Sequence, residues 1–70
     1  MALRDQLDHL IEEMVEKGIR YQDAYREFER RFIIQVLTRH DGCLQDTAEA
    51  MGMHRNTLSR KIAEHRIKKP

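Results

Sequence analysis

Apolar residues recur at steps of three and four along the first third of the chain, which is the spacing of one face of an α-helix. Acidic residues occupy most of the positions between them. The pattern ends at Lys17-Gly18, where a glycine can adopt the left-handed conformation that closes a helix. We therefore expect an amphipathic helix that ends before Gly18. Its apolar stripe consists of Leu3, Leu7, Leu10, Ile11 and Met14.

A second, longer helical pattern covers about residues 20–40, and its apolar face is broad enough to contact two neighbours at once. All the aromatic residues of the chain lie on this segment. For Phe28 and Phe32 the simplest interpretation is ordinary core packing. Tyr21 and Tyr25 have a second interpretation, which is a place in a subunit interface.

Two short helices are predicted after the turn dipeptide Asp41-Gly42. The first covers about residues 44–51 and ends at Gly52, and the second covers about residues 55–65. No strand pattern, internal repeat or low-complexity stretch is present. The sequence therefore predicts an all-α fold of four helices.

The predicted organisation is one domain over residues 1–70, because a chain of this length does not divide further. Within it, the helices of residues 1–40 precede a helix-turn-helix over residues 42–67. Lys68-Lys69-Pro70 is interpreted as a frayed basic tail.

Four residues with characteristic spacing predict the helix-turn-helix, in which two short helices meet steeply across a tight turn. Ala48 is small where the two helices would approach closely, and Gly52 can supply the positive φ that the turn needs. Leu58 and Ile62, four residues apart, would point inward with Met53 and fix the second helix.

The positions among these buried residues, from His54 to Lys61, all carry hydrogen-bond donors, and three of them are permanent cations. Such a face suits the major groove of DNA, which phosphates border. A solvated surface is the alternative, but no acid interrupts residues 50–63, and this absence favours DNA. The donors are His54, Arg55, Asn56, Thr57, Ser59, Arg60 and Lys61.

Charge is divided unevenly along the chain, although the formal net charge is only +1. Residues 1–42 hold seven basic and nine acidic side chains, for a net charge of −2. Residues 43–70 hold six basic and three acidic side chains, for a net charge of +3. This asymmetry indicates a polyanionic partner for the C-terminal part.

Composition argues against several other classes of protein. Cys43 is the only cysteine, so an intrachain disulfide is excluded, and the four scattered histidines do not form the paired ligands of a structural zinc site. We expect no cofactor. A core of this size supplies only ~3–5 kcal/mol, which leads us to expect oligomerisation. Without an export signal or an apolar span, the sequence predicts a cytoplasmic protein.

The stretch from Phe28 to Ile67 resembles the Fis-type helix-turn-helix family, which includes the factor for inversion stimulation and the DNA-binding domains of bacterial enhancer-binding activators. The match runs without a gap and has a specific core. Its motifs are Phe28-Glu-Arg-Arg-Phe-Ile-Ile, Gly42, Ala48, Met51-Gly52-Met53, Arg55-Asn56-Thr57-Leu58 and Arg60-Lys61-Ile62.

The resemblance implies a homodimer in which the first two helices of each subunit form an intertwined bundle. It also implies that residues 55–64 are the recognition helix and that the bound DNA is bent. The interface residues on this reading are the apolar ones of the first two helices. They are Leu7, Leu10, Ile11, Met14, Tyr25, Phe28 and Phe32.

The resemblance further implies roles for single residues at the DNA. Arg55 is the candidate for a base contact, most simply guanine O6 and N7. The phosphate contacts would come mainly from Gln45, Thr57, Arg60 and Lys61. The remaining candidates for contact with DNA are His54, Asn56 and Ser59. Cys43 stands where relatives carry Asn, Ser or Thr, and a cysteine is a weak phosphate donor.

The predicted function is therefore a transcriptional regulator or nucleoid-associated bending factor that binds duplex DNA, with RNA polymerase or other regulators as further candidate partners. The alternative is a helical protein-interaction adaptor, which would not need the basic C-terminal face. An enzyme or metal site on His40 with Cys43, or His54 with His65, lacks suitable geometry, because a turn or three helical turns separate each pair.

Overall fold

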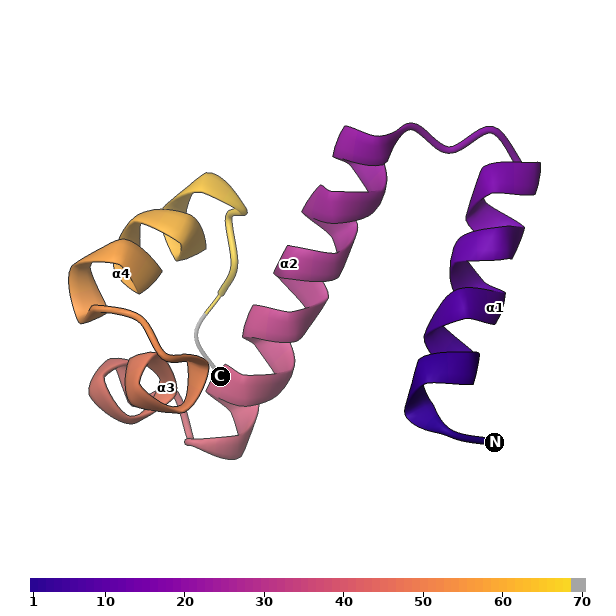
Figure 1. Ribbon diagram of the computed structural model, residues 1–70. Helices are drawn as coiled ribbons and strands as arrows, with labels where there is room; N and C mark the ends of the chain where they lie inside the picture. The colour runs from indigo at the N-terminus through magenta and orange to yellow at the C-terminus, as the bar shows by residue number, and fades with distance from the viewer. Residues whose placement is uncertain (69–70) are drawn as a thin grey trace.

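The computed structural model describes residues 1–68, which form four helices and no strand (Figure 1). Helix α1 covers Leu3–Glu16, α2 covers Tyr21–Arg39, α3 covers Leu44–Met51 and α4 covers Arg55–Glu64. These bounds lie within one residue of the predicted ones, so the all-α prediction is confirmed. None of the helices in the described residues is long and apolar enough to cross a membrane.

The turn between α3 and α4 depends on Gly52, as predicted. This residue has φ 70°, a left-handed conformation that side chains with a Cβ atom rarely adopt. Its backbone N–H donates to the carbonyl of Glu49 over 3.1 Å, and the N–H of Met53 donates to the carbonyl of Ala48 over 3.0 Å. These two bonds satisfy the last carbonyls of α3, and the chain can then enter α4 after only three residues.

The core lies where α3 and α4 pack on the C-terminal half of α2 (Figure 1). Ala48, Leu58 and Ile62 are buried there, which confirms the inward positions that the spacing predicted. Residues on α3, on the turn and after α4 close the edge of this core. The partly buried apolar side chains at that edge are Leu44, Met51, Met53 and Ile67. The helix-turn-helix is thus held to α2 by its own small apolar core.

Helix α1 lies on the opposite side of α2 and runs antiparallel to it (Figure 1). No residue of α1 is buried. The exposed large apolar side chains of the described residues all belong to residues 1–32. A cleft of about 1020 Å³ separates the facing surfaces of α1 and α2. One half of the molecule is therefore well packed, while the other half leaves its apolar face open.

The interpretation of Phe28 and Phe32 as ordinary core residues is wrong for the single chain. Phe28 is 57% exposed and Phe32 is 46% exposed, and their rings contact each other with centroids 5.5 Å apart. The face of α2 that contacts the core carries Ile33 and Leu37 instead. The two phenylalanines point to the cleft side, where α1 covers them only in part.

Candidate nucleic-acid interface

The first turn of α4 is fixed by a cap from His54. The Nδ1 atom of this residue accepts a hydrogen bond from the backbone N–H of Asn56 over 3.0 Å. A side-chain acceptor at this position satisfies one of the free N–H groups that begin every helix. Because Nδ1 accepts, the ring proton of the neutral form lies on Nε2, so His54 keeps a donor for a ligand.

Most of the predicted DNA-contacting residues of α4 are exposed. Thr57 and Lys61 are half-buried. Gln45, on α3, is exposed and donates weakly to Glu49 over 3.5 Å. The exposed members on α4 and its cap are His54, Arg55, Asn56, Ser59 and Arg60. Both helices therefore expose hydrogen-bond donors, and the contacts of each residue with DNA stay predictions.

The two arginines of this surface are free to bind an anion. Arg55 has no carboxylate within 4.0 Å among the residues that the structure describes. Arg60 reaches Glu64 at 3.9 Å, but its side chain is 69% exposed. Exposed pairs of this kind contribute little to stability, so a phosphate can replace the carboxylate at small cost.

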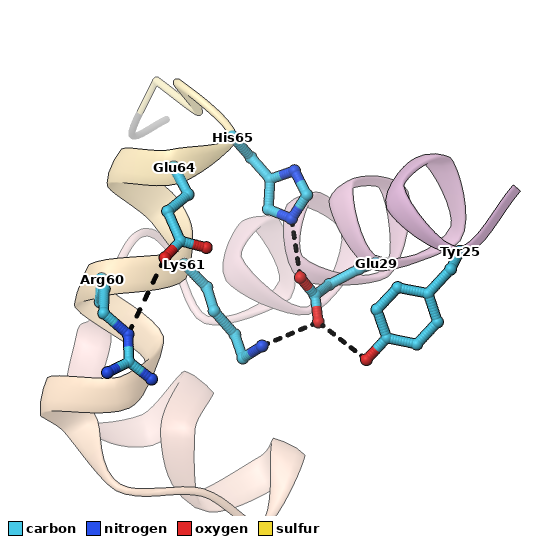
Figure 2. Close-up of polar contacts among 6 residues, drawn as sticks. All are labelled: Tyr25, Glu29, Arg60, Lys61, Glu64 and His65. Carbon is cyan, nitrogen blue, oxygen red and sulfur yellow. Dashed lines mark hydrogen bonds and ion pairs between the residues drawn. The ribbon is translucent and has the colours of Figure 1, made fainter. Parts of the chain in front are cut away.

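Lys61 differs from the arginines because it is held within the protein. Its Nζ atom donates to Oε2 of Glu29, on α2, over 2.9 Å, and its side chain is only 24% exposed. This hydrogen bond raises the pKa of Lys61. Figure 2 shows the lysine reaching from α4 toward α2, apart from the Arg60–Glu64 pair. The sequence predicted a phosphate contact here and did not reveal this partner.

The same carboxylate receives a second bond, from His65. Its Nε2 atom lies 2.8 Å from Oε1 of Glu29 (Figure 2). The hydrogen bond from His65, followed by the one from Lys61, lowers the pKa of Glu29. Glu29 and His65 were missed as site residues because they lie 36 positions apart. No pattern along the chain indicates that such distant residues will meet.

The N-terminus of α3 has no side-chain cap, unlike that of α4. Cys43 precedes the helix, is exposed and makes no side-chain capping bond. Asn, Asp, Ser and Thr are the side chains that cap a helix N-terminus well, and a cysteine thiol does not replace them. Thr47, one turn later, is fully buried and donates its hydroxyl to the Cys43 carbonyl over 2.7 Å. The hydroxyl of Thr47 thus fixes the backbone that precedes α3, whereas the Cys43 side chain does not.

The predicted DNA-contacting residues lie on α3, on α4 and at the cap of α4, whereas the apolar cleft lies between α1 and α2. All seven residues that the sequence places in a dimer interface line that cleft. In residues 1–68, no group of three or more His, Cys, Asp or Glu side chains is arranged to hold a metal ion. The arrangement suits recognition of an extended anion.

Comparison with known proteins gives one match. A sequence model of the Fis family of bacterial regulatory proteins matches residues 24–65, which extend from the first turn of α2 to the end of α4. No curated protein and no solved structure matches the chain.

Proposed function

Because the chain belongs to the Fis family of bacterial regulatory proteins, it is a DNA-binding helix-turn-helix protein, and we propose that it regulates transcription or shapes the nucleoid as a homodimer. In this proposal α4 of each subunit enters the major groove of duplex DNA. The bound DNA bends, as the family resemblance implies. Binding to the chromosome would place the protein in the nucleoid, with RNA polymerase or other regulators as candidate partners.

One observation carries the proposal: the exposed face of α4 offers hydrogen-bond donors, and its first acid is Glu64, at the last position of the helix. Arg55 and Arg60 are exposed there, and residues 50–63 contain no carboxylate that would repel phosphates. Arg55 also lies at the N-terminal end of α4, the end that a recognition helix usually points into the groove. This position supports a base contact by Arg55 and phosphate contacts by residues farther along.

Apart from Lys61, which Glu29 holds, the remaining predicted residues fit the same assignment. Gln45, Thr57 and Arg60 would hold phosphates, which set the register of the protein without reading sequence. His54 would donate through Nε2 at the entrance to the groove, because its Nδ1 is occupied by the cap. Asn56 and Ser59 complete the exposed face. The adaptor alternative is less well supported, because the matched family binds DNA.

The homodimer rests on the cleft side of the molecule. A monomer that exposes so many large apolar side chains over α1 and α2 is unusual, because continuous apolar patches mark sites of association. A second copy that presents the same face would cover them, as a two-fold interface requires. Residues 1–40 would then serve dimerisation, and residues 42–67 would serve DNA binding.

The proposal is tested by selecting binding sites from random duplex DNA with the wild type and with Arg55→Ala. Loss of a base contact should cost ~1–3 kcal/mol and relax the preference at one position of each half-site. Arg4→Ala, which removes the same charge from α1, is the matched control and should retain the wild-type preference. An Arg55→Ala protein that selects the wild-type sequences would show that Arg55 does not read bases.

A further inference from the structure

Glu29 forms the polar connection between the long helix and the recognition helix. Its Oε2 atom accepts from Lys61 Nζ over 2.9 Å, and its Oε1 atom lies 2.8 Å from His65 Nε2. Tyr25, one turn earlier on α2, donates weakly to Oε2 over 3.4 Å (Figure 2). Both oxygens of one carboxylate are therefore used, and both strong contacts come from α4 or the residue that caps it.

This cluster differs from the other ion pairs of the described residues. Those pairs join residues three or four apart on one helix, and their side chains are exposed. In the cluster, the side chain of Glu29 is 17% exposed and that of His65 is 6% exposed. Water therefore screens these charges less than it screens the exposed pairs. The contacts consequently hold α4 against α2 more firmly than a surface pair would.

The geometry points to a role for this carboxylate in DNA binding: Glu29 is a positioning residue that retains Lys61 in the protein and so withholds it from DNA phosphates. The inference rests on the proposed function, because it needs α4 to lie against DNA. For Lys61 to reach a phosphate, its ammonium group must leave a 2.9 Å charge-assisted bond. Arg60, which neighbours it on α4, has no such restraint and remains exposed.

The consequence for recognition concerns the ratio of specific to non-specific binding. Phosphate contacts supply most of the affinity for non-specific DNA, and each one makes binding more sensitive to salt. A lysine held by Glu29 adds nothing to that affinity, while it still fixes the angle at which α4 meets the groove. By holding Lys61, Glu29 thus lowers the affinity of the protein for non-specific DNA, although the lysine remains in the recognition helix.

The test compares the salt dependence of binding to a non-specific duplex by the wild type and by Glu29→Gln. Glutamine keeps the shape of the side chain but loses its charge, so Lys61 should become available to phosphate. Each added phosphate contact steepens the plot of log K against log salt by roughly 0.9. Between ~50 and ~200 mM salt, the loss of affinity should therefore grow by roughly 3.5-fold per subunit.

Two further variants separate this effect from a general change of charge. Glu12→Gln removes the same charge from α1, where the side chain is 79% exposed and lies outside both the cleft and the α4 surface. Its salt slope should equal that of the wild type. The double variant Glu29→Gln/Lys61→Met should lose the steepening, because the released cation is gone.

Lys61→Met alone tests the inference from the other side. A withheld lysine makes no phosphate contact, so its loss should leave the salt slope unaltered even if affinity falls. Circular dichroism would show whether Glu29→Gln folds. If it does not fold, the salt slope of Lys61→Met still tests whether Lys61 contacts a phosphate. A slope that flattens in Lys61→Met, or fails to steepen in a folded Glu29→Gln, would overturn the inference. A wild type whose binding does not respond to salt would instead overturn the proposed function, and the inference with it.

Discussion

Replacing Phe32 by alanine perturbs the open apolar face on which the proposed dimer depends. In the single chain this side chain is 46% exposed, so only about half of its surface is already removed from water. Truncation of a fully buried phenylalanine costs ~3–5 kcal/mol. A lone subunit should therefore lose roughly half of that, ~1.5–2.5 kcal/mol. In a dimer that covers the rest of the ring, each subunit should lose the full amount.

The difference is large in relation to the stability that such a chain can have. A core of this size supplies ~3–5 kcal/mol, so a loss of ~3–5 kcal/mol in each subunit would leave little folded protein. We expect Phe32→Ala to be unfolded, or nearly so, at micromolar concentration. The wild type should unfold at a temperature that rises with protein concentration, because association stabilises the folded state by mass action.

The assay combines thermal unfolding at several protein concentrations with sedimentation. Leu58→Ala is the control, because Leu58 is fully buried in the core of the helix-turn-helix and does not line the cleft. It should lower stability by ~2–5 kcal/mol, and its folded fraction should still sediment as a dimer. The reasoning fails if the wild type is a folded monomer at micromolar concentration. It also fails if Phe32→Ala lowers the free energy of unfolding by no more than the ~1.5–2.5 kcal/mol expected for a lone subunit.

Two further predictions concern the polar contacts of α4. The lowered pKa of Glu29 means that its carboxylate stabilises the folded state above its ordinary value of 4.5, and that this stabilisation disappears as the pH falls below it. In urea unfolding, the destabilisation caused by Glu29→Gln should shrink from neutral pH to about pH 3, and a constant difference would contradict the assignment. For the cap, His54→Ala should cost ~0.5–2 kcal/mol, whereas His54→Asn should retain the wild-type stability because asparagine is a strong N-cap. Equal losses in the two His54 variants would show that the bond to Asn56 does not stabilise α4.

The features that the sequence predicted correctly all depend on neighbours along the chain. The helix bounds follow from apolar spacing and from glycines that end a segment, and the turn at Gly52 follows from its freedom to adopt positive φ. Leu58 and Ile62 share a helix face because they are four residues apart, so their burial also follows locally. These properties need no knowledge of how the helices meet.

The features that the sequence did not reveal depend on the angles between helices. Apolar spacing showed that α2 has a broad apolar face, but not that Ile33 and Leu37 would contact the core while Phe28 and Phe32 faced the cleft. Similarly, Lys61 has the same sequence signature as a phosphate-binding cation whether or not a carboxylate lies nearby. Its pairing with Glu29 arises only once α4 packs on α2.

The three faces of α2 link the two parts of the proposed function. Phe28 and Phe32 belong to the face that a second subunit would cover, whereas Ile33 and Leu37 belong to the face that packs on the helix-turn-helix. Glu29 lies between these faces and holds α4 directly. If two copies associate through the cleft, the separation and tilt of their recognition helices are therefore set by α2. The spacing of half-sites on DNA would then depend on the dimer interface, although no residue of that interface needs to contact DNA.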